Sequence, residues 1–295
     1  MITNLLQGKK GLITGIINKR SIAYGIAKTL SEHGAKFAVT YQNKAIREKL
    51  LPVADEFHLD EELLLECDVS NEKTIDNTFK IIEKKWGTLD FLVHAIAFSD
   101  KEELRGKYIN TSLNNFLNAM HISCYSLTAL AQRAEKMMPN GGSLLTLSYY
   151  GAEKVMPNYN VMGLCKAALE ASVKYLACDL GPQNVRVNAI SAGPIRTLAS
   201  SGISNFHLIS EWNRNNSPLR RNTSIEDVGK AALYLLSDLS SGTTGEILHV
   251  DSGYNVVGMK VVDSNIINNN KNLESSSSRV QEKILLKPDN MTYTC

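Results

Sequence analysis

Short apolar runs alternate along this chain with longer segments in which apolar residues recur every three or four positions. The short runs predict buried β-strands at 9–14, 35–42, 62–69, 88–97, 143–148, 185–191 and 245–251. The longer segments predict helices at 21–34, 44–57, 71–85, 112–138, 157–180 and 225–238. Apolar strands that alternate with helices are typical of βαβ units, whose parallel sheet carries helices on both faces. We therefore expect an α/β fold, a single doubly wound Rossmann-type domain with about seven parallel strands.

The pattern changes near residue 260. The segment SNIINNNKNLESSSSRVQEK is rich in Asn and Ser and has no apolar period, and the final run KILLKPDNMTYTC is too short to build a core. The sequence thus predicts one folded domain over 1–259 and a mobile tail over 260–295, which could instead have a function of its own or cross to another subunit. Within the domain, 192–222 has no clear pattern and is expected to be irregular.

Composition narrows the class of protein. Apolar residues make up 43% of the chain, charged residues 21%, and the formal net charge is +2, as in ordinary soluble globular proteins. The chain has no Lys/Arg-rich tract that would follow nucleic-acid phosphates and no apolar run long enough to span a membrane. Its cysteines are scattered without a CxxC pair, which favours reduced thiols, a cytoplasmic location and no metal site: Cys67, Cys124, Cys165, Cys178 and Cys295.

The first strand-to-helix junction, from Gly15 to Gly25, is a candidate phosphate loop. Glycine permits a tight turn, and the free N–H groups at a helix start attract a pyrophosphate. The loop is longer than the GxGxxG fingerprint and has Ser21 and Ala23 where the backbone would approach a ligand. Its position at the first βα junction favours nucleotide binding over an ordinary turn.

Two residues at later strand ends match the adenosine half of a dinucleotide. Asp68 closes the third strand, where it would accept a hydrogen bond from the adenine amino group or simply begin the next helix. Gln42 ends the second strand, where many NAD enzymes place an acidic residue for the ribose hydroxyls. No arginine directly follows Gln42 to receive a 2′-phosphate, so we expect NADH rather than NADPH.

The stretch LSYYGAEKVMPNYNVMGLCKAALEA carries the candidate chemistry. Tyr159 and Lys166 are seven positions apart, about two helical turns, so both are expected on nearly the same face of the predicted helix. A phenol and an ammonium there can polarise a carbonyl oxygen and hold a cofactor hydroxyl. Short-chain enzymes that reduce carbonyls have a tyrosine four residues before the lysine, and a serine thirteen residues before that tyrosine. In this chain the two positions hold Met162 and Tyr149, so the spacing argues against a carbonyl reductase.

With these features the chain resembles the short-chain dehydrogenase/reductase superfamily and, within it, the bacterial NADH-dependent enoyl-[acyl-carrier-protein] reductases. The resemblance covers about residues 5–258 and rests on TGIINKRSIAYGIA, CDVS, the tyrosine–lysine stretch, VRVNAISAGPIRTLASSGI and GEILHVDSGY. It implies an oxidoreductase of fatty-acid biosynthesis that reduces the double bond of a trans-2-enoyl thioester carried by acyl carrier protein. It also implies a homotetramer.

The resemblance assigns roles to individual residues. Tyr159 would donate to the thioester oxygen, and Lys166 would hold the nicotinamide ribose, with Tyr149 completing the catalytic set. Matches to dinucleotide contacts are Gly15, Ser21, Ile22, Gln42, Asp68, Val69, Ile96, Lys166, Ile195 and Thr197. Matches to the acyl pocket are Phe98, Tyr149, Tyr159, Met162, Ile203 and Phe206, each of which could instead be ordinary core packing.

The sequence also departs from the family. Ala95 and Ala97 stand where members usually have Ser and Gly after the fourth strand, and the stretch SNFHLISEW has no basic residue for an acidic carrier protein before Arg214. The 196–215 segment is expected to be an apolar lid over cofactor and acyl chain, or else an amphipathic helix. The rival functions are a short-chain carbonyl reductase and a non-catalytic dinucleotide-binding protein.

Overall fold

The computed structural model describes residues 4–198, 200, 203 and 205–259. Contacts divide the chain into 1–256 and 257–295, and the predicted tail over 260–295 lies outside the described residues. The strands are β1 (Lys10–Ile13), β2 (Lys36–Tyr41), β3 (Leu64–Glu66), β4 (Phe91–His94), β5 (Gly142–Ser148), β6 (Val185–Ala192) and β7 (Ile247–Val250). The α-helices are α1 (Ile22–Glu32), α2 (Lys44–Glu56), α3 (Glu72–Trp86), α4 (Leu113–Met120), α5 (Ser126–Ala134), α6 (Val161–Leu180), α7 (Phe206–Asn216) and α8 (Ile225–Leu236).

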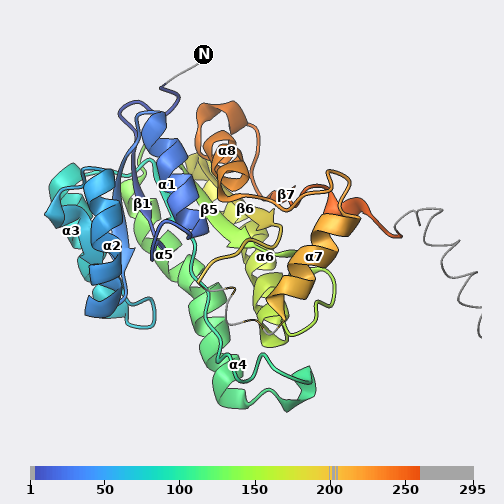
Figure 1. Cartoon of the computed structure of the whole chain (residues 1–295). Coiled ribbons are helices and arrows are strands. Elements are labelled where there is room, and N and C mark those ends of the chain that lie inside the picture. The colour runs from blue at the N-terminus through green and yellow to red at the C-terminus, as the bar shows by residue number, and fades with distance from the viewer. Residues whose placement is uncertain (1–3, 199, 201–202, 204, 260–295) are drawn as a thin grey trace, which may run out of the picture. The chain divides into compact units, whose positions relative to one another are not determined.

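All seven strands form one parallel sheet in the order β3-β2-β1-β4-β5-β6-β7. The chain first builds outward from β1 and then returns to add β4 on its other side, so the strand order reverses between β1 and β4. In doubly wound sheets, ligands bind at the carboxyl ends of the strands beside such a reversal. The predicted fold class is confirmed, and the sheet directs attention to this edge (Figure 1).

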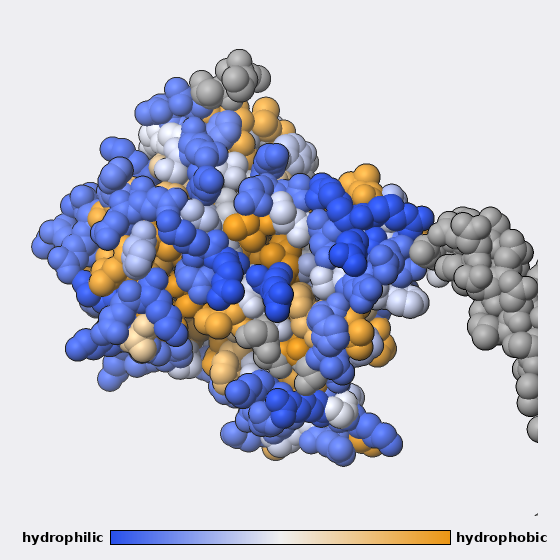
Figure 2. Space-filling model, viewed as in Figure 1, coloured by the Kyte–Doolittle hydropathy of each residue, from blue (hydrophilic) through white to orange (hydrophobic). Residues whose placement is uncertain are grey.

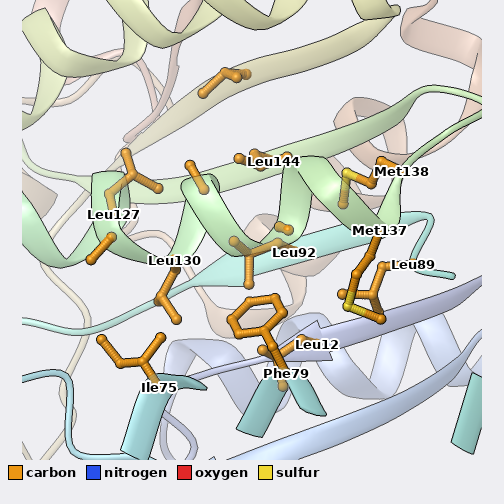
Figure 3. Close-up of a cluster of buried hydrophobic side chains, with 14 of the residues drawn as sticks. Leu12, Ile75, Phe79, Leu89, Leu92, Leu127, Leu130, Met137, Met138 and Leu144 are labelled. Carbon is orange, nitrogen blue, oxygen red and sulfur yellow. The ribbon is translucent and has the colours of Figure 1, made fainter. Parts of the chain in front are cut away.

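Alternate residues of the strands face two separate cores. Leu12, Leu92 and Leu144 face one layer, which α3, α5 and α6 cover. The next residues, Ile13 and Val93, face the opposite layer, which α1, α2 and α8 cover. Figure 3 shows the first layer, where Leu127 and Leu130 of α5 lie against the sheet and Phe79 and Ile75 of α3 meet them from below. Burial on both faces explains why the strands read as continuous apolar runs.

Helix boundaries differ from the expectation in three places. The predicted 112–138 helix is interrupted by a π-helical turn, His121–Tyr125, between α4 and α5, and it bends there (Figure 1). The predicted 157–180 helix begins only at Val161, because Asn160 has a φ of +41° and cannot be helical. The stretch expected to be irregular, 192–222, contains the eleven-residue helix α7. None of the described helices is long and apolar enough to cross a membrane.

Candidate active site

The loop between β1 and α1 lies directly against the loop that follows β4. Gly15 has a φ of +84°, and a Cβ there would lie 2.0 Å from the carbonyl oxygen of Ala95. Only glycine fits such a close approach. Ser21 precedes α1, and its Oγ accepts hydrogen bonds from the N–H groups of Ile17 (3.0 Å) and Asn18 (3.2 Å). The serine therefore holds the loop in shape.

Helix α1 begins without a side-chain cap, because the Ser21 hydroxyl is turned back into the loop. The first N–H groups of an uncapped helix, together with the helix dipole, favour an anion such as a pyrophosphate. Ile22 is the first residue of α1 and is packed, half-buried, on the adjacent core. Gly15, Ser21 and Ile22 thus lie where the sequence placed them, and the loop fits the phosphates of a dinucleotide.

Gln42 and Asp68 follow the neighbouring strands β2 and β3 and lie beside each other. The Gln42 Nε2 donates to Asp68 Oδ2 at 3.3 Å. Partial burial acts to raise the pKa of Asp68, but hydrogen bonds from Ser70 and Gln42 outweigh it and hold the pKa below its usual value. Asp68 is therefore an anionic acceptor beside a neutral amide.

The other cofactor candidates also lie at the carboxyl edge of the sheet. Ile96 follows β4 and Ile195 follows β6, and each is half-buried against a different core layer. The backbone N–H of Thr197 donates to Ser200 Oγ at 2.9 Å, which forms a local turn. Val69 differs, because its side chain is 6% exposed and belongs to the core. The role of Val69 in cofactor binding stays a prediction.

Lys166 is buried in α6, with a relative exposure of 6%. Its Nζ donates a 2.7 Å hydrogen bond to the carbonyl oxygen of Leu147, near the end of β5. Burial lowers the pKa of Lys166 to about 8, while Cys165, Cys124 and Glu170 act in the opposite direction. The side chain is therefore still largely an ammonium at neutral pH.

Tyr159 is also buried, at 8% exposure, but it does not lie on the helix with Lys166. The expectation of a shared helical face is wrong, because the chain turns at Asn160 before α6 begins. The Asn160 Nδ2 donates to the carbonyl oxygen of Glu103 at 3.0 Å and stabilises this turn. Burial raises the pKa of Tyr159 well above that of a free phenol, so the hydroxyl stays protonated.

An apolar cluster surrounds Tyr159. The rings of Tyr149 and Tyr159 meet edge to face, with centroids 5.0 Å apart. Met162 and Ile203 belong to the same cluster, so the structure brings together four of the predicted acyl-pocket residues. Sequence reasoning missed its remaining members, which come from α4, α6 and the segments before them: Leu104, Phe116, Ala119, Met120, Met156, Val161 and Cys165.

Phe98 and Phe206 are not members of this cluster. Phe98 is 47% exposed, and Phe206 is the first residue of α7 and half-buried. Figure 2 shows hydrophobic residues gathered towards the middle of this view, whereas the surface over α2 and α3 is mainly hydrophilic. The placement of Phe98 and Phe206 in the acyl pocket stays a prediction.

Ser123, in the π-helical turn, is a further residue that the sequence did not single out. Its buried Oγ accepts from the N–H of Phe98 at 2.9 Å, donates to the carbonyl oxygen of the same residue at 3.0 Å, and lies 3.9 Å from Met162 Sδ. The hydroxyl thus fixes the loop after β4 against the tyrosine cluster. Turns of this kind are frequent at functional sites, but a π turn has no sequence signature to reveal it.

No group of three or more His, Cys, Asp and Glu side chains in the described part of the chain is arranged to hold a metal ion. The four cysteines described are free thiols. The groups that the structure brings to the carboxyl edge of the sheet are the candidate phosphate loop over 15–25, called the nucleotide loop below, the buried phenol of Tyr159 and the buried ammonium of Lys166.

Comparison with known proteins identifies the family to which this chain belongs. A family model described as enoyl-(acyl carrier protein) reductase matches residues 15–255. The chain belongs to this reductase family. An NADH enoyl-[acyl-carrier-protein] reductase of Rhizobium meliloti is 60% identical over 262 residues, which cover 89% of this chain and 96% of that one.

Solved structures of family members agree with this assignment. The enoyl-(acyl-carrier-protein) reductase of Anaplasma phagocytophilum, in complex with NAD, is 62% identical, with a TM-score of 0.85 over 88% of this chain and 98% of that chain. The Bacillus cereus member, crystallised with NADP+ and indole naphthyridinone, is 48% identical, with a TM-score of 0.85 over 87% of this chain and 100% of that one. The predicted family is confirmed.

Ser21 gives the first test of the nucleotide loop. We expect Ser21→Ala to weaken NADH binding roughly tenfold, since each 1.4 kcal/mol lost is tenfold in Kd and two loop N–H groups lose their acceptor. Fluorescence titration with NADH would measure the change. Ser172→Ala is the matched control, because that hydroxyl bonds only within α6 and to Cys124. Unchanged NADH affinity in Ser21→Ala would contradict the assignment of the loop.

Proposed function

We propose that this protein reduces the carbon–carbon double bond of trans-2-enoyl-acyl-carrier-protein thioesters with NADH, as the last step of a fatty-acid elongation cycle. The observation that carries the proposal is a buried Tyr159 and Lys166, in the Tyr-x6-Lys spacing, at the same sheet edge as the nucleotide loop. The names of the relatives, NADH-dependent enoyl-[acyl-carrier-protein] reductases, support it.

The reaction places its main demand on one oxygen atom. The carbon β to the thioester carbonyl is electrophilic, and negative charge develops on the thioester oxygen as an enolate when that carbon accepts hydride. Bound NADH would supply the hydride, and the enolate then takes up a proton at the carbon α to the carbonyl, from water or from Tyr159, to complete the reduction. The protein must stabilise the enolate oxygen, and one well-placed donor in such a site is worth about 3 kcal/mol.

Tyr159 is the donor in this proposal. Its raised pKa keeps the phenol protonated, so it donates to the thioester oxygen throughout the neutral range. The edge-to-face contact with Tyr149 fixes the ring and excludes water from one side. Met162 and Ile203 extend the apolar wall along the acyl chain.

Lys166 and the nucleotide loop orient the cofactor. The ammonium of Lys166 would hold the nicotinamide ribose hydroxyls, and its charge favours hydride delivery to the substrate. Gly15, Ser21 and Ile22 would hold the pyrophosphate, and Asp68 and Gln42 would hold the adenosine. Gln42 is neutral, which suits unphosphorylated ribose hydroxyls and supports NADH over NADPH.

Helix α7 is the main described part of the proposed lid over 196–215; residues 199, 201–202 and 204 of that segment lie outside the described residues. Phe206 and Ile209 are half-buried on α7, whereas Leu208 is 53% exposed. Trp212 Nε1 donates to the Tyr254 hydroxyl at 3.1 Å and so ties α7 to the segment after β7. The segment contains an amphipathic helix, which was the alternative that the sequence offered to a lid, and its role as a lid stays a prediction.

Three arginines in and after α7, Arg214, Arg220 and Arg221, are weak candidates for a carrier-protein docking face, against the alternative of an ordinary solvated loop. Arg221 is paired with Asp227, with two hydrogen bonds of 2.5 and 3.1 Å. The Arg220 guanidinium donates to the carbonyl oxygen of Asn215 at 2.7 Å. Arg214 is exposed in the last turn of α7 and is the stronger candidate to meet an acidic carrier.

The homotetramer is supported by an exposed apolar stripe. Leu113 and Leu117 lie four residues apart on α4, so they share one side of that helix, and Tyr125 ends the π-helical turn that follows it. The three side chains are 72%, 58% and 44% exposed. On α6, Leu164 and Tyr175 are also exposed. Light scattering on the purified protein should give a mass four times the 32.5 kDa of the chain; a monomer would contradict this part of the proposal. We also place the enzyme in the cytoplasm, consistent with its free thiols.

A direct assay tests the proposed reaction. We expect loss of NADH absorbance with crotonyl- or longer enoyl-coenzyme A that depends on the double bond, and slower oxidation of NADPH measured in parallel. If coenzyme A thioesters fail, the authentic enoyl-carrier protein is the deciding substrate. Activity on ketones alone would support a carbonyl reductase, and NADH binding without any turnover would support a dinucleotide-binding protein.

Two substitutions separate the roles of tyrosine and lysine. Tyr159→Phe should lower kcat about 100-fold and leave NADH affinity nearly unchanged, because it removes only the oxyanion donor. Lys166→Ala should lower both kcat and NADH affinity. Steady-state kinetics and NADH titration measure both values, and parent-like NADH binding by Lys166→Ala would remove the proposed role of the lysine.

A further inference from the structure

Helix α6 is attached to the end of β5 at two consecutive residues. Lys166 Nζ donates to the carbonyl oxygen of Leu147, as described above. One turn further along α6, the carboxylate of Glu170 accepts a very short hydrogen bond from the hydroxyl of Ser148. Residues four apart lie on one face of a helix. The two contacts together therefore fix how α6 lies against the strand.

Ser148 begins a polar row across the sheet. It is in register with Ser191 of β6, which is in register with His249 of β7. Residues paired this way point to the same face of the sheet, here the face that α6 covers. His249 Nε2 lies 2.6 Å from Glu153 Oε1, so a carboxylate lies at each end of the row. The middle hydroxyl, Ser191 Oγ, is buried and has no hydrogen-bond partner among the described residues.

Several charged groups surround Glu170. Lys166 and Lys174 lie one turn before and after it on α6, Glu153 comes from the turn after β5, and His249 comes from β7. Burial raises the pKa of Glu170, while the hydrogen bond from Ser148 acts to lower it. Glu170 also acts on Tyr159 and on Lys166 through space. Glu170 is thus a half-buried carboxyl group whose charge makes the smallest of the contributions that raise the pKa of Tyr159 and of Lys166.

We propose that Glu170 is a positioning residue for Lys166: through Ser148 it fixes α6 against the end of β5, and from the same helix face, four residues along, it supplies a negative charge to the buried ammonium. The proposal rests on the proposed function for the role of Lys166 itself. Glu170 acts on the cofactor through the lysine and does not contact the reacting atoms. The proposal has two parts, that Glu170 fixes the helix and that it supplies charge, and different substitutions test each part.

Glu170→Gln removes the charge but keeps the shape and the capacity to hydrogen-bond with Ser148. Lys166 then loses a carboxylate that raises its pKa, so its pKa falls below about 8. The lysine loses its proton as pH rises through that value, so the loss begins at lower pH in the variant. We expect the basic limb of kcat/KM, and of NADH affinity, to move to lower pH in Glu170→Gln and not in Asp179→Asn, with values near the parent's at about pH 6.

Ser148→Ala tests the attachment of the helix. The carboxylate keeps its charge but loses its hydrogen bond, so NADH affinity should fall several-fold at every pH without a shift of the basic limb like that of Glu170→Gln. Ser148→Thr keeps the hydroxyl and should restore affinity. The matched controls are Asp179→Asn, an exposed carboxylate on the same helix, and Ser172→Ala.

The measurements are NADH titration by fluorescence and enoyl-coenzyme A kinetics from about pH 6 to pH 9, with thermal unfolding to confirm that each variant is folded. If Glu170→Gln keeps the parent's basic limb, the charge role is wrong; if Ser148→Ala keeps the parent's NADH affinity, the attachment role is wrong. If Glu170→Gln fails to fold, comparison of Ser148→Ala with Ser148→Thr still decides the attachment role. Misfolding of this isosteric variant would also show that Glu170 does more than position Lys166, which contradicts the proposal. Failure of the proposed reductase function would be distinguishable from failure of the role of Glu170, because the parent enzyme itself would then oxidise no NADH.

Discussion

The buried ammonium of Lys166 is the most demanding interaction in this domain. Removing a charged group from water costs several kcal/mol unless the protein replaces the lost hydrogen bonds. The replacement includes the carbonyl oxygen of Leu147, 2.7 Å away, which is available only when α6 lies along the end of β5. Burial lowers the pKa of Lys166 to about 8, and the nearby groups Cys165, Cys124 and Glu170 act to raise it, so this value reflects the balance of the two effects. The lysine thus ties its own protonation to the packing of a helix on the sheet.

That packing depends in turn on the core beneath it. Leu169 and Val173, on the inner face of α6, are fully buried against β5 and β6. The strand reversal between β1 and β4 then places the nucleotide loop at the same edge of the sheet, where Gly15 touches the Ala95 carbonyl. A side chain at Gly15 would separate these two loops. The nucleotide loop and the lysine are therefore positioned by one rigid layer of parallel strands rather than by the loops themselves.

The sequence predicted most of this because the apolar runs are buried on both faces and read clearly. The seven strands, the helices that cover them and the position of the nucleotide loop all follow from hydrophobic pattern and glycine placement. The family also followed, from the tyrosine–lysine spacing and the motifs around it. The π turn at His121–Tyr125 did not follow, since an apolar period of three to four residues does not show a single inserted residue. Helix α7 was only one of two alternatives for 196–215, because its apolar face is short. Contacts such as Ser123 with Phe98, or Ser148 with Glu170, join residues far apart in sequence and leave no local pattern.

The Tyr-x6-Lys spacing also has a different cause from the one that the sequence suggested. Seven helical residues would place Tyr159 and Lys166 about two turns apart along one face. In the structure, the segment Pro157-Asn158-Tyr159-Asn160 is a turn in which both asparagines have positive φ, 59° and 41°. Asparagine tolerates this conformation better than most residues, and a Pro-Asn-x-Asn run is itself a turn signal. The extra residues between tyrosine and lysine thus form a turn that precedes α6. This turn lets the ring of Tyr159 meet that of Tyr149 edge to face, while Lys166 lies on α6. In this chain the spacing therefore encodes a turn rather than a longer helical face.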